Sequence, residues 1–161
     1  MTWSVIDTNV LAVANGAHEN AGEACVAACI DALLQAQTGG VLVDEGREIF
    51  EQYRRNASLR GQPGVGDVFW KWLWDNQANE SVCMQIPLEW IGPEPTDYAE
   101  FPADPRLATF DRSDRVFVAV AIASEMPHAV LNASDTDWWP VRDVLAEYNV
   151  RVTFLCPELM T

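Results

Sequence analysis

Short apolar segments alternate with helical segments along the whole chain, and this alternation limits the fold more than any other feature. Strand-like runs are expected at residues 3–6, 41–43, 82–86, 129–131 and 150–155. Helical spacing of apolar residues is expected at 23–37, 47–56, 67–76, 115–124 and 138–148. Strands that alternate with helices form a parallel sheet covered by helices on both faces. The sequence therefore predicts a three-layer α/β/α fold with a mainly parallel central sheet.

The predicted domain extends over residues 1–161, because no linker, repeat or low-complexity segment divides the chain. Residues 87–110 contain five prolines and are expected to form an ordered but irregular crossover. The 115–124 helix is apolar almost all round, which predicts that it is buried against the sheet.

The chain is strongly acidic, with 24 Asp and Glu against 10 Lys and Arg and a formal net charge of −14. Such a charge disfavours simple electrostatic binding of nucleic acid, unless a metal ion or a local basic strip offsets it. No apolar run of about 18 residues indicates a membrane span. The first residues carry no basic region of a secretory signal, so none is expected.

The four cysteines, Cys25, Cys29, Cys83 and Cys156, are scattered along the chain. Cys25 and Cys29 are one helical turn apart in an apolar stretch, which predicts buried free thiols. No C-x-x-C pair is present, and both histidines are far from the cysteines in the sequence, so a zinc site is poorly supported. Reduced thiols predict a cytoplasmic location.

Acidic residues recur where expected strands end and where the buried helix begins: Asp7, Asp44, Asp111, Asp114, Asp135 and Asp137. The carboxyl ends of parallel strands lie at one edge of the sheet, and the helices that follow begin there. Carboxylates brought together repel one another unless a cation lies among them. Oxygen ligands favour Mg²⁺ or Mn²⁺ over zinc. The sequence therefore predicts a divalent-metal site at this edge.

Each acid also has a purely structural interpretation. Asp7 and Asp114 precede helical segments and suit helix N-caps, and Asp135-Thr136-Asp137 suits an Asx-turn. The metal site is favoured because four separate segments deliver carboxylates to one edge.

Three segments in order resemble the acidic motifs of the PIN domain, a family of metal-dependent nucleases that includes many toxin ribonucleases. They are Val-Ile-Asp-Thr-Asn-Val-Leu at 5–11, Phe-Asp-Arg-Ser-Asp-Arg-Val-Phe-Val-Ala-Val-Ala at 110–121, and Val-Leu-Asn-Ala-Ser-Asp-Thr-Asp-Trp at 130–138. The resemblance extends over essentially the whole chain.

The second motif of that family fits less well. The family carries a Glu before an apolar or aromatic residue on the helix after strand two, whereas here Gln52 precedes Tyr53. Glu48 lies one turn earlier on the same helical face and is the preferred substitute. Asp44 is the next choice, and Glu51 is about 100° away around the helix.

The resemblance implies a divalent-metal-dependent endoribonuclease, the toxin of a toxin–antitoxin pair being one form of it. Its implied catalytic residues are Asp7, Glu48, Asp114 and Asp135, and its implied metal ligands are Asp7, Asp44, Asp114, Asp135 and Asp137. Asn9, Asp111 and Ser134 would support the site, with one or two Mg²⁺ or Mn²⁺ ions. Candidate partners are RNA, an antitoxin protein and a second copy of the chain.

Two surface features would serve these partners. A basic lane of Arg47, Arg54, Arg55 and Arg60 would follow the RNA backbone. An apolar edge with Trp70 and Trp74 would contact the antitoxin.

Two other classes of function stay open. A binding or regulatory module that keeps the fold without activity is favoured by Gln52. A Rossmann-like or phosphatase-like protein is disfavoured, because the chain has no G-x-G-x-x-G and Asp7-Thr8-Asn9 lacks the second Asp of a phosphatase motif.

Overall fold

A computed structural model describes residues 2–94 and 96–160. Its central sheet has five parallel strands in the order β3-β2-β1-β4-β5. The strands are β1 (Trp3–Ile6), β2 (Val41–Asp44), β3 (Cys83–Ile86), β4 (His128–Asn132) and β5 (Val152–Phe154). The predicted fold class is confirmed, and β1 lies at the centre of the sheet.

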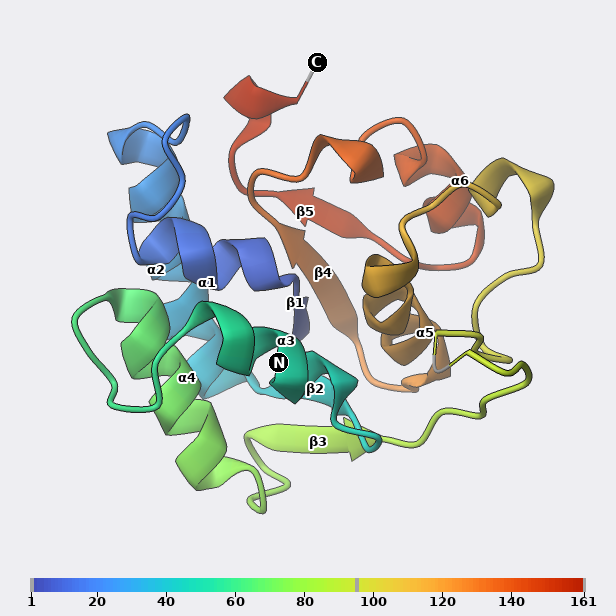
Figure 1. Cartoon of the computed structure of the whole chain (residues 1–161), viewed down its shortest axis with the longest axis horizontal. Coiled ribbons are helices and arrows are strands. Elements are labelled where there is room, and N and C mark those ends of the chain that lie inside the picture. The colour runs from blue at the N-terminus through green and yellow to red at the C-terminus, as the bar shows by residue number, and fades with distance from the viewer. Residues whose placement is uncertain (1, 95, 161) are drawn as a thin grey trace.

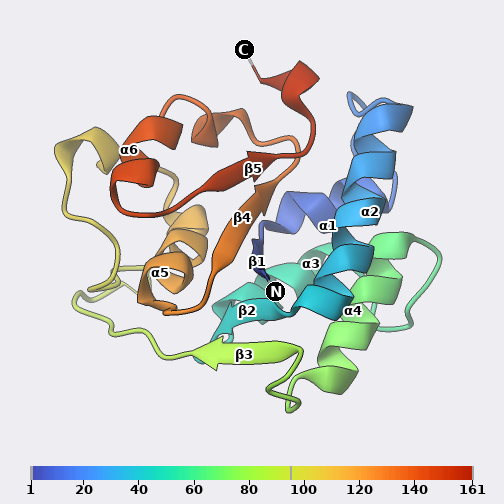
Figure 2. The same cartoon turned by 180° about the vertical axis from the view of Figure 1, so that it is seen from behind.

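Helices cover both faces of the sheet (Figure 1 and, from behind, Figure 2). On one side lie α1 (Thr8–Ala14), α2 (Glu23–Gly39) and α4 (Val65–Asn76), which contact one another. On the other side lie α5 (Arg115–Ala123) and α6 (Arg142–Glu147). Helix α3 (Glu48–Asn56) contacts both α1 and α5. It therefore joins the two layers beside the strand ends that carry the acidic residues.

The core is built from apolar strands that are buried on both faces. Val5, Ile6 and the Val41–Val43 segment are essentially inaccessible to solvent. Helix α5 packs against β1, β2 and β4 and is buried from Val116 to Ala121, as its all-round apolar sequence predicts. This packing fixes the start of α5 against the ends of β1 and β4.

The C-terminal third departs from the predicted boundaries. The helix expected at 138–148 is divided into the short 3₁₀ helix η3 (Thr136–Trp138) and α6. Pro140 lies between them and cannot donate a backbone hydrogen bond, which accounts for the interruption. The 87–110 crossover is irregular, as expected, with one 3₁₀ helix (η1, Pro105–Leu107) and a bridge between Trp90 and Tyr98.

The cysteines were predicted only in part. Cys25 and Cys156 form a disulfide, so the expectation of reduced thiols is wrong for this pair. The sequence could not show this, because 131 positions separate the two residues and only the fold brings them together. Cys29 is a buried free thiol, as predicted, and Cys83 is also free and buried. Among the described residues, no helix is long and apolar enough to cross a membrane.

Candidate metal centre

Three carboxyl groups from distant parts of the chain converge at one edge of the sheet. One oxygen from each of Asp7, Asp114 and Asp135 lies within 4.8 Å of the others. Asp7 follows β1, Asp135 follows β4, and Asp114 ends the short 3₁₀ helix η2 (Arg112–Asp114) directly before α5. The strands β1 and β4 are neighbours in the sheet, and α5 packs against both of them. The three acids therefore meet at the carboxyl edge of the sheet. The predicted convergence is confirmed.

The three carboxyls open into a pocket of about 400 Å³. Its wall also includes Thr8, Asn9, Gln52 and Ser134. Apart from Ala12 and Arg55, every side chain that lines the pocket offers oxygen or amide groups. The pocket therefore has the chemistry of a hard-cation site rather than an apolar ligand site.

Asp7 is the most deeply buried of the three acids. Its side chain is buried, and Oδ1 accepts only a long hydrogen bond of 3.3 Å from the Asn9 N–H. Oδ2 is buried without a hydrogen-bond partner. An unpaired buried carboxylate oxygen is strongly unfavourable unless it is protonated or binds a cation. The geometry of Asp7 thus fits a metal ligand.

Trp138 is the residue beside Asp7 that the sequence analysis missed. Its indole is buried, and its N–H lowers the pKa of Asp7 although it makes no hydrogen bond of ordinary geometry. An aromatic residue after the D-x-D turn was visible in the sequence, but not its approach to Asp7.

Burial, together with neighbouring carboxyl groups, raises the pKa of two of the three acids. Burial, with the nearby charge of Asp135, raises the pKa of Asp7 from 3.8 to about 7. Burial, followed by the charges of Asp7 and Asp135, raises the pKa of Asp114 to about 9. Both shifts show that a second and third negative charge are disfavoured here without a compensating cation.

Two asparagines hold the strand ends together. Asn9 Nδ2 donates to Asn132 Oδ1 at 2.8 Å, and Asn9 Oδ1 accepts from the Ala133 N–H at 2.9 Å. Asn132 Nδ2 in turn donates to the Asp135 carbonyl at 2.9 Å. Asn9 therefore fixes the loop that carries Asp135, whereas the role predicted for it was to position the water or the phosphate. Asn132 was missed, although a fully buried amide at the end of an apolar strand is a usable signal.

Gln52 connects the segments that carry Asp7 and Asp114. Its Nε2 donates to the Ser113 carbonyl at 2.7 Å, and its Oε1 accepts from the Thr8 hydroxyl at 3.3 Å. The amide thus lies in the pocket wall beside the three acids and adds no charge to them.

The other predicted ligands lie outside the three-carboxylate cluster. The Asp44 carboxylate accepts from the N–H groups of Glu48 and Ile49, at 2.8 and 2.9 Å, and so caps the start of α3. Glu48 is half-buried one turn before Gln52, and burial raises its pKa. Neither Asp44 nor Glu48 belongs to the cluster or the pocket wall. The sequence predicted that Asp44 ends its strand, but it could not predict the direction of the Asp44 side chain.

Two further candidates are turn-formers at the rim. Asp111 Oδ1 accepts from the backbone and hydroxyl of Ser113, which caps η2. Asp137 is exposed, and its N–H donates to Asp135 Oδ1 at 2.9 Å in the predicted Asx-turn. Ser134 lines the pocket.

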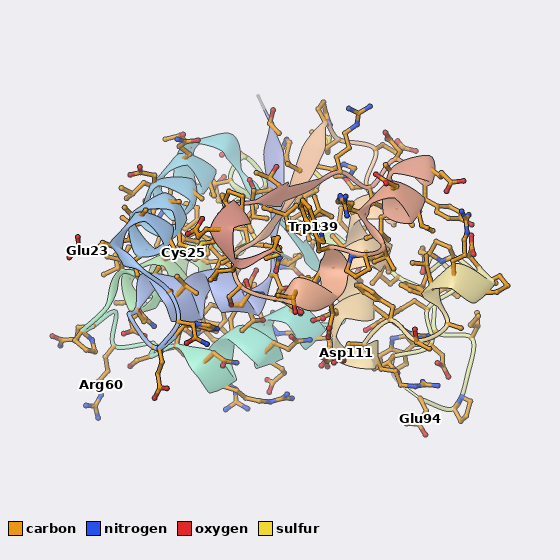
Figure 3. All side chains as sticks on the ribbon, turned by 90° about the horizontal axis from the view of Figure 1, so that it is seen from above. Glu23, Cys25, Arg60, Glu94, Asp111 and Trp139 are labelled. Carbon is orange, nitrogen blue, oxygen red and sulfur yellow. A yellow bond between two sulfur atoms is a disulfide. The ribbon has the colours of Figure 1, made fainter. Side chains whose placement is uncertain are left out.

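The four arginines that were predicted to form a basic lane lie in different environments. Arg55 lines the pocket that contains the acids. Arg54 pairs with Glu51, and Arg47 stacks on Phe50 and Trp74. Arg60 lies well away from Asp111 in the view of Figure 3. Only Arg55 therefore offers a cation at the pocket itself.

A scan against protein-family models, a search of curated proteins and a search of solved structures found no significant match to this chain.

Proposed function

We propose that the protein is a PIN-like, divalent-metal-dependent endoribonuclease whose centre is the cluster of Asp7, Asp114 and Asp135. The observation that supports this most strongly is the unpaired, buried Asp7 Oδ2 among two further carboxyls. Without a cation, the folded protein would bear the energetic cost of burying carboxyl groups and of holding them close to one another. Mg²⁺ or Mn²⁺ suits the oxygen-only donor set.

In this proposal, Asp7, Asp114 and Asp135 are the direct ligands, and one ion suffices for their geometry. Such an ion, when bound, lowers the pKa of a bound water and screens charge on the phosphate. Asn9 and Asn132 position the Asp135 loop, and Ser134 offers a hydroxyl to the phosphate. Arg55 attracts the RNA backbone to a chain whose net charge would otherwise repel it. Glu48 and Asp44, which lie outside the cluster, would act on the ion only through water.

Partners and location follow from the proposed substrate. A cytoplasmic location is proposed from the RNA substrate alone, because the Cys25–Cys156 disulfide removes the argument from reduced thiols. An antitoxin or a second copy of the chain would be its protein partner. The surface predicted for an antitoxin needs correction, because of its two tryptophans Trp70 is buried and only Trp74 is exposed. Helix α4 therefore offers a smaller apolar surface than the sequence suggested.

A catalytically weak or inactive PIN-like module that binds protein or RNA is the second candidate. Gln52 favours this candidate. A fourth acid at this position would strengthen metal binding, but Gln52 is neutral, and its amide is already hydrogen-bonded to Ser113 and Thr8. The two candidates differ in turnover, since an inactive module would bind RNA without cleaving it.

The test is cleavage of labelled RNA by the purified protein in Mg²⁺, in Mn²⁺ and in EDTA. The proposal expects cleavage that depends on the metal and disappears in EDTA. Cleavage that persists in EDTA would contradict a metal-dependent mechanism. Binding without cleavage, in both metals, would select the inactive module.

A further inference from the structure

A second convergence of ligating side chains lies outside the carboxylate cluster and is made only of sulfur. The Sγ atoms of Cys25, Cys29 and Cys156 lie within 4.8 Å of one another, and all three residues are buried. Cys25 lies in the first turn of α2, and Cys156 directly precedes the 3₁₀ helix η4 (Pro157–Leu159). Figure 3 labels Cys25 on the α2 ribbon. The cluster thus joins the second helix to the C-terminal segment.

The third sulfur has the position of a ligand rather than of a remote core residue. Cys29 follows Cys25 by one turn on the same face of α2, so both side chains point toward Cys156. Cys83 is the natural comparison. It is also buried and free, but it belongs to no group of ligating side chains among the described residues.

We propose that the reduced protein binds one thiophilic ion of the Zn²⁺ class through Cys25, Cys29 and Cys156. In a tetrahedral site with Zn–S bonds near 2.3 Å, two sulfur ligands stand about 3.8 Å apart. Three sulfurs already gathered within 4.8 Å need only small movements to reach that geometry. The fourth position is left for a water or for Glu158, whose charge acts on Cys29.

The disulfide and the metal are alternative states of the same three residues. A low-molecular-weight dithiol breaks the Cys25–Cys156 bond, is itself oxidised to a cyclic disulfide, and transfers two protons to the two sulfurs. Metal binding then displaces the thiol protons of all three cysteines, so each sulfur binds the ion as a thiolate. In the oxidised state only Cys29 remains as a thiol in the cluster, and the site is closed to metal.

Either state ties the C-terminal segment to α2, but each responds to a different condition. The inference does not depend on the carboxylate centre, because the two clusters share no residue. It gives Cys29 a function that a single disulfide between Cys25 and Cys156 leaves unexplained.

The experiment is a titration of the protein with Cd²⁺ and Co²⁺, before and after reduction by a phosphine. We expect thiolate-to-metal charge-transfer absorption at one equivalent in the reduced protein and none in the oxidised protein. Cys29→Ser should bind with an affinity lower by about tenfold or more, whereas Cys83→Ser should behave as wild type. Carboxylate ligands give no such absorption, so the result is independent of the proposed nuclease centre.

Three results would overturn the proposal. They are no absorption in the reduced wild type, an unchanged titration in Cys29→Ser, and equal binding before and after reduction. If reduction alone unfolds the protein, Cd²⁺ or Zn²⁺ should restore a cooperative thermal transition, and failure to do so would also overturn it.

Discussion

Two pairs of buried aspartates have nearly the same exposure and opposite surroundings. Asp44 and Asp67 are 3% and 5% exposed, and Asp7 and Asp114 are 4% and 8% exposed. Asp67 accepts hydrogen bonds from Ser58 N–H, Gly64 N–H and Asn15 Nδ2, at 2.7, 2.9 and 3.1 Å. Asp44 likewise accepts two backbone N–H groups.

The second pair faces carboxyl groups where the first pair faces donors. Asp7 has one unpaired oxygen, and Asp114 has Asp7 and Asp135 as its charged neighbours. Burial of an acid is therefore not what marks a site in this protein. The distinguishing feature is a buried acid with too few donors for its oxygens and with other carboxyl groups beside it, and this combination predicts a bound cation.

The largest effect is expected on RNA cleavage. Asp7→Asn removes a ligand charge while it keeps the shape and one acceptor oxygen, and metal-dependent cleavage should fall by about 100-fold or more. Asp31→Asn, which removes an exposed charge on α2, should cleave at the wild-type rate. The rate is measured on labelled RNA in Mn²⁺. Equal rates in Asp7→Asn and wild type would show that Asp7 is no more a metal ligand than Asp44 or Asp67.

The next effect is on stability, and it should appear at the structural pair alone. Asp67→Ala leaves three donors without their acceptor and should lower the free energy of unfolding by about 2–4 kcal/mol. Asp75→Ala, on the same helix but in an exposed pair with Lys71, should change it by about 0.5 kcal/mol or less. Urea unfolding measures both variants. A loss at Asp67 that metal reverses would mean that this acid, too, belongs to a cation site.

Metal-free protein should lose stability as the pH rises. The pKa values of Asp7 and Asp114 are raised from 3.8 to about 7 and about 9, so the folded protein keeps protons that the unfolded chain releases. Their stabilising effect is complete below pH 4 and is lost as the pH rises to 9, at about 1.4 kcal/mol per pH unit for each retained proton.

Urea unfolding in EDTA, from pH 5 to pH 9, measures this slope. Saturating Mn²⁺ favours the ionised carboxylates and should flatten it. A metal-free stability that rises over the same range would contradict the crowding of the two acids.

A smaller effect is expected at Gln52. Gln52→Glu replaces the donor to the Ser113 carbonyl and adds a fourth negative charge, so metal-free stability should fall by about 1 kcal/mol or somewhat more. The rise in melting temperature on adding Mn²⁺ should exceed that of wild type. Gln35→Glu, exposed on α2, supplies the same charge elsewhere and should leave the rise unchanged. A rise in Gln52→Glu no larger than in wild type would show that this position does not reach the ion.

The same comparison shows how far the sequence could be interpreted. Alternation of strands and helices predicted the fold, and the rule for strand ends predicted that Asp7, Asp114 and Asp135 meet. The rule for strand ends could not show that Asp44 lies outside this cluster, because the direction of a side chain at a strand end depends on which N–H groups are nearby. For Asp44 these are the first N–H groups of α3.

Long-range partners were equally beyond the sequence. The Cys25–Cys156 disulfide and the Asn9–Asn132 bond join residues more than 100 positions apart. The burial of Trp70 depends on Phe50 and Tyr53 of a different helix, which pack against its ring. Local periodicity carries no information about such contacts.

The central claim is that the cluster of Asp7, Asp114 and Asp135 holds a divalent cation, and thermal unfolding with Mg²⁺ or Mn²⁺ tests it most directly. At a metal concentration a hundredfold above Kd, wild type should gain about 2.7 kcal/mol, or roughly 5–10 °C in melting temperature. Asp114→Asn should gain much less and should melt higher than wild type in EDTA at neutral pH, because the variant folds without having to protonate or desolvate a carboxylate at this position. Equal gains in both proteins, or no gain in wild type across millimolar metal, would contradict the claim and leave these acids as helix and turn caps.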